Sequence, residues 1–369
     1  MRILHINCNY IGTTLHQLMI EHLDALEIEN EVFVPTYDKN IAVIKPNDNV
    51  YISECFNKWD RLVFDYKQQK IIKAIEQHYD VASFDLIHAY TLYTDGNAAR
   101  VLSEKYGIPY VVAVRNTDVN DFLKKMIHLR SRGVKNLDEA SKVFFLSKPY
   151  CMQVLDHYVP EEKRDSIISK VEIIPNGIDD FWFEHLYLDK DKVQKNKIKL
   201  VYAGGINKNK NVSTTLKAMD LLHSKGIETK LTVVGKVIDR GEYEKIIADV
   251  NTTYISAQPK EKLIDIYRDN DIFVMPSIHE TFGLVYAEAM SQGLPVIYSK
   301  GQGFDGQFPE KMVGLHVNAE SAEEVSSAIR EIYDDYENYV SACVRRCTKF
   351  RWKDIVTKYM NVYNEIIPQ

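Results

Sequence analysis

Residues 271–299 read DIFVMPSIHETFGLVYAEAMSQGLPVIYS and contain one complete strand–loop–helix–strand unit. The apolar runs at 271–277 and 294–299 predict two buried strands. Between them, 284–292 predicts a helix, which Gly283 precedes in a short loop. Two buried strands joined by a helix are typical of a parallel sheet, so this stretch predicts an α/β fold.

The same alternation extends through most of the chain. Before residue 180, the sequence predicts strands at 2–7, 31–35, 85–90, 109–114, 142–147 and 171–175, with helices at 13–27, 60–79, 95–106 and 148–157. After residue 190, it predicts strands at 199–204, 229–235 and 253–256 and helices at 212–224, from 242, and at 260–268, 321–333, 336–348 and 352–366. We therefore expect two Rossmann-like doubly wound domains, 1–180 and 190–350, facing a ligand cleft. The lysine-rich run at 188–197 is interpreted as a solvated linker.

The composition excludes several classes of function. Of the 369 residues, 45% are apolar, which excludes wholesale disorder. The 46 basic and 52 acidic residues give a net charge of −6, and the tyrosines are scattered, so no nucleic-acid partner is expected. The five cysteines form no C-x-x-C pair, and no run approaches the ~20 apolar residues of a membrane span. Residues 1–10, MRILHINCNY, contain no long apolar run or small-residue cleavage site, so no signal peptide is expected there. We therefore expect a cytoplasmic protein with reduced thiols.

A pair of glutamates flanks the loop before the predicted helix. The helix begins near Leu284, where free backbone N–H groups and the positive end of the helix dipole suit a phosphate. Glu280 precedes that point and Glu288 follows it inside the helix. Carboxylates repel phosphate but accept hydrogen bonds from hydroxyls, so the pair indicates a sugar and a ribose on either side of a diphosphate. The alternative is an ordinary helix start with one half-exposed glutamate, and the residues alone leave both interpretations open.

Two other patterns are weaker. Asp269-Asn270-Asp271 contains an aspartate pair, but it lies where a predicted helix ends and a strand starts, so we interpret it as a cap and expect no metal. Segment 122–148 carries seven basic and two acidic residues, a local charge of +5, with apolar residues among them. It predicts either peripheral contact with an anionic membrane or a solvated helix that also faces the core.

The residues around the glutamate pair resemble a known family. They stand in the frame PS..E.FGL...EAM..G.PV, which is similar to the signature of the family-4 retaining glycosyltransferases of the GT-B fold. Four further segments resemble the same family: VEIIPNGID at 171–179, KLVYAGGINKNKNV at 199–212, KLTVVGK at 230–236 and FRWKDIVTKYMNVY at 350–363. The resemblance implies that the terminal helix, 352–369, returns to pack on the first domain.

The resemblance also implies a role for each matching residue. Glu280 would contact hydroxyls of the donor sugar, and Glu288 would bind the nucleotide ribose. Lys210 would neutralise the diphosphate. Gly12 matches a first loop that approaches the donor phosphates, although glycine there also fits a plain turn. The amides that would hold the diphosphate and sugar belong to Thr281, Phe282, Gly283 and Leu284.

Two positions depart from the family pattern. The loop that ends in Lys210 usually supplies an arginine as well, and that position is Gly205. In the first domain, VVAVRNTD at 111–118 places Arg115 where the family commonly has a histidine that reaches the donor sugar. Our hypothesis is that Arg115 replaces the cation missing at Gly205, because a guanidinium stays charged and grips phosphate with two hydrogen bonds. The alternative is a structural Arg115 that pairs with Asp118 or Asp121.

The resemblance predicts a nucleotide-sugar-dependent, retaining hexosyltransferase. The donor, such as a UDP- or GDP-sugar, is a substrate bound by domain 190–350, and no metal or other cofactor is expected. Domain 1–180 would receive a glycan or lipid-linked acceptor, in bacterial surface polysaccharide or glycoconjugate synthesis. The alternatives are a GT-B nucleotide-sugar epimerase and a non-catalytic sugar-nucleotide-binding partner of another transferase.

Overall fold

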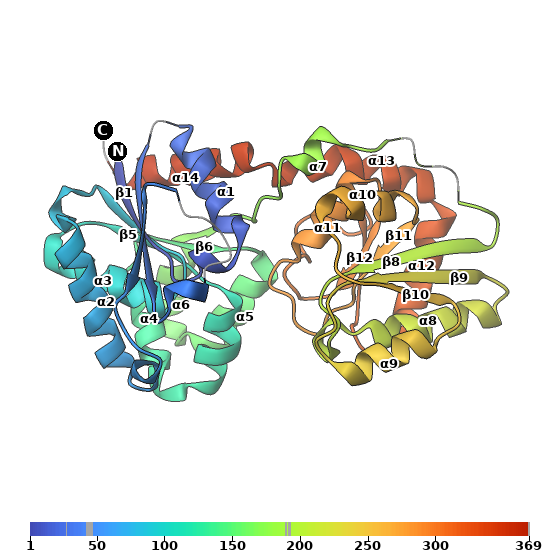
Figure 1. The fold of residues 1–369 in the computed structure, drawn as a ribbon, viewed down its shortest axis with the longest axis horizontal. Helices are drawn as coiled ribbons and strands as arrows, with labels where there is room; N and C mark the ends of the chain where they lie inside the picture. The colour runs from blue at the N-terminus through green and yellow to red at the C-terminus, as the bar shows by residue number, and fades with distance from the viewer. Residues whose placement is uncertain (27, 42–46, 189, 191–192, 368–369) are drawn as a thin grey trace. The chain divides into compact units, whose positions relative to one another are not determined.

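The computed structural model describes residues 1–369 except 27, 42–46, 189, 191–192 and 368–369 (Figure 1). The chain divides into two compact units: unit 1 is Met1–Gly177 with Trp352–Gln369, and unit 2 is Ile178–Arg351. Each unit has one sheet of parallel strands with helices interleaved between them. The predicted fold class, two doubly wound α/β domains, is confirmed. No helix in the described part of the chain has the length and apolar character needed to cross a membrane.

The sheet of unit 1 has seven strands. In spatial order they are β3 (Val50–Glu54), β2 (Glu29–Thr36), β1 (Arg2–Ile6), β4 (Leu86–Ala89), β5 (Tyr110–Ala113), β6 (Lys142–Phe145) and β7 (Val171–Ile173). β1 pairs with β2 on one side and with β4 on the other, so the strand order reverses between β1 and β4. Ligands of open α/β sheets bind beyond the carboxyl ends of the strands at such a switch point.

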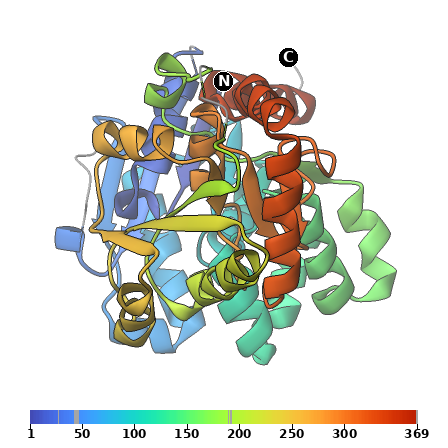
Figure 2. The same cartoon turned by 90° about the vertical axis from the view of Figure 1, so that its right-hand side faces the viewer.

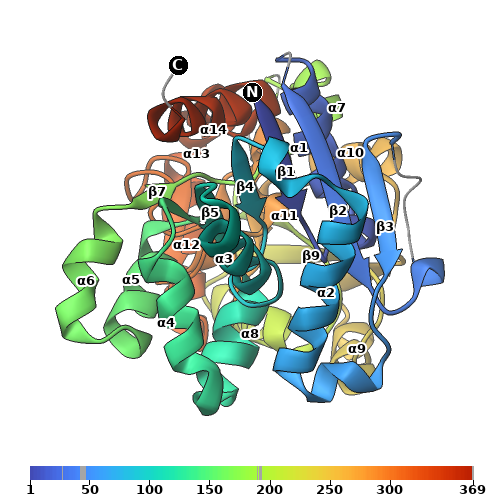
Figure 3. The ribbon, with the colours of Figure 1, turned by 90° about the vertical axis from the view of Figure 1, so that its left-hand side faces the viewer.

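Two apolar cores cover the faces of this sheet. One core lies under α1 (Thr14–Asp24) and α14 (Trp352–Ile366), and the other lies under α2 (Phe64–His78), α3 (Thr94–Tyr106), α4 (Arg130–Asp138), α5 (Lys148–Tyr158) and α6 (Glu161–Ile168) (Figure 3). The returning helix α14 is fixed by a hydrogen bond of 2.7 Å between His88 Nδ1 and the Tyr363 hydroxyl. Gly177 allows the close approach of Trp352, because a Cβ at 177 would lie 2.4 Å from the indole.

The sheet of unit 2 has six strands. Their order is β10 (Thr252–Ile255), β9 (Glu228–Val234), β8 (Lys197–Ala203), β11 (Ile272–Val274), β12 (Val296–Ser299) and β13 (Gly314–Val317). Its helices are α7 (Phe181–Glu184), α8 (Val212–Ser224), α9 (Arg240–Ala248), α10 (Lys260–Arg268), α11 (Leu284–Ser291), α12 (Ala322–Asp334) and α13 (Tyr336–Arg346). Helices α8 and α9 lie on one side of the sheet, and α10 and α11 lie on the other (Figures 1 and 2). Here the strand order reverses between β8 and β11.

The sequence does not predict five of these elements, one of which is the four-residue helix α7. β3 is an edge strand in which Ser53 is the buried residue, so its apolar signal is weak. β13 reads GLHV and contains a glycine and a half-buried histidine, so it has no continuous apolar run. α4 contains Gly133, which favours a loop by propensity, but a Cβ there would lie 2.4 Å from the Tyr93 hydroxyl. α6 is mostly polar and buries Ile167. In each case tertiary packing, rather than local pattern, determines the element.

Candidate donor site

The loop between β11 and α11 carries most of the predicted site. Gly283, with φ of 75°, makes the turn into α11, and a Cβ there would lie 2.5 Å from the Tyr286 ring. Glycine is therefore required both by the backbone and by packing. Phe282 is buried, and its ring centroid lies 5.5 Å from that of Phe350, which anchors the loop. The amides of Thr281, Phe282 and Gly283 donate no hydrogen bond to any described residue, so this helix start can accept an anion.

A second loop, at 300–306, supports the first. The Glu280 amide donates to Gln302 Oε1 at 2.9 Å, and the Gly303 amide donates to the Glu280 carbonyl at 2.7 Å. A Cβ at Gly303 would lie 1.8 Å from the Thr281 carbonyl oxygen, so only glycine fits. Sequence reasoning missed Gln302 and Gly303. The glycine-rich run KGQGFDG, directly after a predicted strand, is the signal that marks them.

Lys210 and Glu280 meet at the switch point of unit 2. Lys210 ends a short 3-10 turn, Lys208–Lys210, after β8, and its Nζ lies 2.5 Å from Glu280 Oε2. The two side chains are 23% and 13% exposed. Asn207 fixes the turn, because its Oδ1 accepts the Lys210 amide at 3.1 Å. The structure therefore brings together the two side chains assigned to the diphosphate and to the donor sugar.

Glu288 lies in the second turn of α11 without a partner. Its carboxylate makes no hydrogen bond or ion pair with any described residue, although the side chain is largely covered. Burial raises the pKa of Glu288 to about 7, nearby Asp179 acts in the same direction, and Lys260 opposes them. Asp179 and Lys260 form an ion pair of 2.5 Å and were not predicted as part of the site. An unpartnered carboxylate of this kind suits two vicinal hydroxyls, such as those of a ribose.

Gly205 follows β8 with an ordinary backbone. It has no positive φ, and its carbonyl accepts a hydrogen bond from the Tyr202 hydroxyl at 2.9 Å. A Cβ there would lie 2.6 Å from Cδ1 of Ile238, an exposed side chain that can turn away. The backbone therefore tolerates a side chain at 205, and the missing cation is not imposed by the fold.

The two predicted residues of unit 1 are placed differently. Gly12 is exposed at the end of the 3-10 turn Tyr10–Gly12, and a Cβ there would contact nothing within 4 Å, so the fold does not demand glycine. The Arg115 guanidinium donates to the Tyr90 carbonyl at 3.3 Å and to Asn176 Oδ1 at 3.4 Å. Donor binding by Gly12 and Arg115 stays a prediction.

The structural alternative for Arg115 is wrong in its partners. The Arg115 amide, rather than its guanidinium, donates to Asp118 Oδ2 at 2.8 Å. Asp121 instead pairs with Lys125 at 2.6 Å.

Segment 122–148 forms a short helical turn, Ile127–Leu129, followed by α4 and β6 instead of one amphipathic helix. Leu123 and Leu129 are buried in the core, whereas Met126 and Ile127 are 38% and 66% exposed. Several of its cations have partners within unit 1: Lys125 pairs with Asp121, Arg132 with Asp65, Lys135 with Glu139, and Lys142 with Glu172 and Glu365. The free basic surface is therefore smaller than the sequence suggests.

Asp269 lies at the end of a helix, as predicted, whereas Asp271 bonds to the neighbouring strand β8. Asp269 ends α10, and Asp271 Oδ2 accepts the Lys199 amide at 2.7 Å. Another group in the described residues has the geometry for a metal ion: ligand atoms of Asp305, Glu310 and His316 lie within 4.8 Å of one another. His316 Nδ1 is 3.1 Å from a carboxylate oxygen of each acid.

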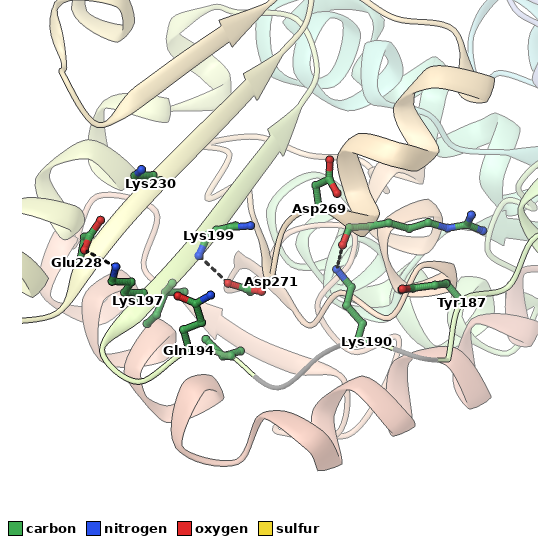
Figure 4. A pocket seen from close by; sticks show the side chains of 12 residues that line it. Tyr187, Lys190, Gln194, Lys197, Lys199, Glu228, Lys230, Asp269 and Asp271 are labelled. Carbon is green, nitrogen blue, oxygen red and sulfur yellow. Dashed lines mark hydrogen bonds and ion pairs between the residues drawn. The ribbon is translucent and has the colours of Figure 1, made fainter.

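A pocket of about 330 Å³ opens at the amino ends of β8 and β9, at the opposite edge of the sheet (Figure 4). Lys190 comes from the run interpreted as a solvated linker, of which residues 189, 191 and 192 lie outside the described chain. For Lys190 that interpretation is wrong. Its Nζ donates to the carbonyls of Tyr267, Arg268 and Asn270 at the end of α10, and burial lowers its pKa to about 8. Lys197 pairs with Glu228 at 3.7 Å. These lysines serve the fold.

Family models match both units. The model described as Glycosyltransferase Family 4 matches residues 12–180, and the one described as Glycosyl transferases group 1 matches residues 186–346. A D-inositol 3-phosphate glycosyltransferase of Pseudarthrobacter chlorophenolicus is 26% identical over 283 residues, which cover 72% of this chain and 66% of the relative. A sulfoquinovosyl transferase of Arabidopsis thaliana is 28% identical over 168 residues, which cover 44% of this chain and 32% of the relative. The chain thus spans just under two thirds of the first relative's length.

Solved structures share the fold over the whole chain. Sucrose-phosphate synthase from Thermosynechococcus elongatus has a TM-score of 0.77 at 19% identity, covering 99% of this chain and 98% of that one. Anabaena HepE in complex with UDP and glucose has a TM-score of 0.67 at 14% identity, covering 100% of both chains. Since the two family models together match residues 12–346 except 181–185, the chain belongs to the family-4 glycosyltransferases of the GT-B fold.

Proposed function

We propose that this chain transfers a hexose from a nucleotide-sugar donor to an acceptor hydroxyl with retention of anomeric configuration and without a metal or other cofactor. The observation that carries the proposal is the arrangement of side chains and amides at the carboxyl ends of the strands of unit 2. There Lys210 and Glu280 are in contact, while Glu288 has no partner among the described residues and the loop amides are free. HepE, a neighbour of the same fold, holds UDP and glucose, which supports a donor of this class.

Each group has a part in the transfer. The bond between the anomeric carbon and the diphosphate oxygen breaks, and its electron pair stays on that oxygen. Lys210 and the amides of residues 281–284 stabilise the growing negative charge. Glu280 holds sugar hydroxyls, and Glu288 holds the ribose. The acceptor hydroxyl bonds to the anomeric carbon on the same face and gives its proton to the diphosphate oxygen, so no side-chain base is assigned.

Unit 1 receives the acceptor in this proposal, and the setting is bacterial surface polysaccharide or glycoconjugate synthesis at the inner face of the membrane. Five apolar side chains of unit 1 are exposed within two short stretches: Trp59, Leu62, Val63, Met126 and Ile127. Exposed apolar residues beside lysines favour peripheral contact with an anionic bilayer. Sedimentation with vesicles of phosphatidylglycerol tests this contact. Equal binding by an Ile127→Ser, Met126→Ser variant would contradict it for this segment.

A thermal-shift screen against UDP-, GDP-, ADP- and TDP-sugars tests donor binding, because a bound donor stabilises the folded state by mass action. We expect one nucleotide to raise the melting temperature of the wild type. Glu288→Ala should weaken binding of the matching nucleoside diphosphate and nucleotide sugar alike, by about 10- to 100-fold, since it removes charge-assisted hydrogen bonds. Glu320→Ala, an exposed acid of unit 2, is the control. The absence of a shift with every nucleotide sugar contradicts the proposal.

Product analysis separates transfer from its two alternatives. A transferase releases nucleoside diphosphate slowly without acceptor and rapidly with it. An epimerase converts the donor sugar when no acceptor is present, and a non-catalytic partner binds the donor without converting it. Intact Lys210, Glu280 and Glu288 favour transfer, because a silent site has no need for all three.

A further inference from the structure

Unit 1 has its own pocket at its own switch point. The pocket has a volume of about 560 Å³, within the usual range for small ligands. Cys8 and Asn9 follow β1, Thr91 follows β4, and Thr117 follows β5, so the pocket opens at the carboxyl ends of the strands where their order reverses. A doubly wound sheet places its ligand at this position.

Lys67 of α2 lines this pocket and is nine-tenths buried. Its Nζ donates to Thr94 Oγ1 at 3.0 Å, and no carboxylate of a described residue lies within ion-pairing distance of it. The rings of Phe56 and Phe64 lie 5.4 Å and 6.0 Å from the ammonium. Burial lowers the pKa of Lys67, because the charged ammonium is less well solvated in the pocket than in water. A covered ammonium with spare N–H donors is stabilised by an anion.

The nearby acids are already engaged. The Asp95 carboxylate accepts the Cys8 amide at 3.1 Å and the Thr91 hydroxyl at 3.0 Å. Asp118 accepts the Leu92 amide at 2.9 Å. Burial raises the pKa of Asp95 to about 7 and that of Asp118 to about 6. The charge of Asp95 attracts the Lys67 ammonium, but no described carboxylate forms an ion pair with it.

The pocket rim and walls complete the site. Arg61, exposed at the rim, lies 5.4 Å from the Tyr37 ring and adds a second positive charge. The Phe122 ring stacks on that of Tyr93 with 4.5 Å between the ring centroids. Its centroid lies 6.3 Å from that of Phe64, and these rings form an aromatic wall. The C–H faces of a sugar ring pack on such a wall, and the threonine hydroxyls of the pocket can bond its hydroxyls.

We propose that this pocket binds an anionic sugar acceptor, with the Lys67 ammonium pairing with its phosphate or carboxylate group. The proposal rests on the proposed function in naming the ligand an acceptor. Its anion chemistry rests on unit 1 alone. Glycosyl transfer to a hydroxyl of that sugar leaves the anionic group unchanged.

Calorimetric titration without donor tests the site with four probes: glucose 6-phosphate, glucuronate, octyl phosphate and glucose. We expect an anionic sugar to bind at least tenfold more tightly than glucose. Lys67→Met should remove that preference. Lys70→Met is the matched control, because Lys70 lies one turn further along α2, pairs with Asp60 at 2.7 Å and does not line the pocket. It should bind like the wild type.

The probes also separate the sources of the anion. Preference for glucose 6-phosphate assigns a phosphate, preference for glucuronate assigns a carboxylate, and both support the proposal. Binding of octyl phosphate without either sugar overturns the sugar part, because it assigns the anion to a lipid tail. Equal binding by wild type and Lys67→Met overturns the proposal, as does failure of all four probes.

Two further measurements guard against misinterpretation. Replacing an uncompensated buried charge by an apolar side chain should leave the melting temperature unchanged or raise it, so Lys67→Met should fold. Should it fail to fold, amide NMR of the wild type still decides, since an anionic sugar should shift Thr91 and Thr94 and glucose should not. A protein that binds the anionic sugar but no nucleotide sugar retains this inference and loses the proposed function. A protein that binds a nucleotide sugar but no anionic sugar retains the proposed function and loses this inference.

Discussion

The switch points of the two units have the same topology, but the lysine at each has a different kind of partner. In unit 2, Lys210 lies 2.5 Å from Glu280, so its charge is balanced before any ligand arrives. In unit 1, Lys67 donates to the Thr94 hydroxyl and has no ionic partner among the described residues. A ligand of unit 2 must therefore rearrange an existing ion pair, whereas a ligand of unit 1 supplies the missing charge. The partner of a lysine, rather than its presence, indicates what the site binds.

The amino edge of the unit 2 sheet shows a third arrangement. Its pocket is also lined by lysines, but Lys190 caps α10 and Lys197 pairs with Glu228 (Figure 4). A pocket rich in cations is therefore not by itself an anion site. This contrast explains why we assign ligands to the carboxyl edges, where a doubly wound sheet binds them.

The largest effect should come from breaking the balanced pair. Lys210→Met removes the cation that stabilises the departing diphosphate and leaves Glu280 without its partner. Turnover should fall by about 10²- to 10³-fold, as for loss of one strong electrostatic contact in a transition state. The control is Lys208→Met, two residues earlier in the same turn. Steady-state kinetics check the prediction, and equal turnover in the two variants would remove Lys210 from catalysis.

Arg115 should follow, with a loss of about 100-fold in turnover for Arg115→Ala if it compensates for Gly205. Arg115→Lys should recover part of the loss, since an ammonium cannot reproduce a guanidinium grip. Gly205→Arg in the Arg115→Ala background should restore activity, because the backbone at 205 is ordinary and Ile238 can turn aside. The two positions would then be energetically coupled.

The same variants also test a structural role for Arg115. The guanidinium bonds to the Tyr90 carbonyl and Asn176, so a structural role predicts a lower melting temperature with normal turnover of the folded fraction. Normal turnover in folded Arg115→Ala therefore contradicts compensation.

Glu280→Gln should have a smaller effect, about tenfold in turnover, because the amide keeps the side-chain shape but loses the charge that orients the sugar. Affinity for nucleoside diphosphate should change little. Titration with diphosphate alone provides the check. Should diphosphate affinity fall as far as turnover, Glu280 contacts the phosphates and its assignment to the sugar is wrong.

The sequence predicts the central features of unit 2 well for a physical reason. Strands β11 and β12 are buried on both faces and appear as continuous apolar runs, and the loop before α11 needs Gly283 for its backbone. The pairing of Lys210 with Glu280 was not predicted, since it joins two loops 70 residues apart. Nor were Gln302 and Gly303, which hold the loop before α11 from the loop that follows β12.

Unit 1 was harder to read from sequence. Lys67 lies in a helix with two other lysines, and only the fold shows that it faces inward beside Thr94 while Lys70 reaches Asp60. The apolar residues of segment 122–148 likewise divide between core and surface, because the chain forms the 3-10 turn Ile127–Leu129 and then α4 instead of one continuous helix. Burial of polar side chains depends on contacts distant in sequence, and no local pattern reports it.

The smallest effect concerns stability and depends on the carboxylate of Glu288. Glu288 has a folded-state pKa of about 7 against an ordinary value of 4.5, because burial penalises its charge and no described residue pairs with it. Between these values the folded state holds more protons than the unfolded state, so the free energy of unfolding falls as pH rises. Glu288→Gln removes this dependence. At pH 8 it should therefore stabilise the protein by at most about 3 kcal/mol, and at pH 5 by much less.

Calorimetric melting of wild type and Glu288→Gln at pH 5 and pH 8, without nucleotide, measures this difference. Glu320→Gln, an exposed acid, should show no such change between the two pH values. The same Glu288→Gln variant should bind nucleoside diphosphate more weakly at pH 8, because the amide lacks the charged acceptor for the ribose. Gain of stability together with loss of binding is the signature of a group kept for its ligand. Equal stabilisation at both pH values would instead show that ionisation of Glu288 does not destabilise the folded protein. The argument that places Glu288 in the ribose site would then fail.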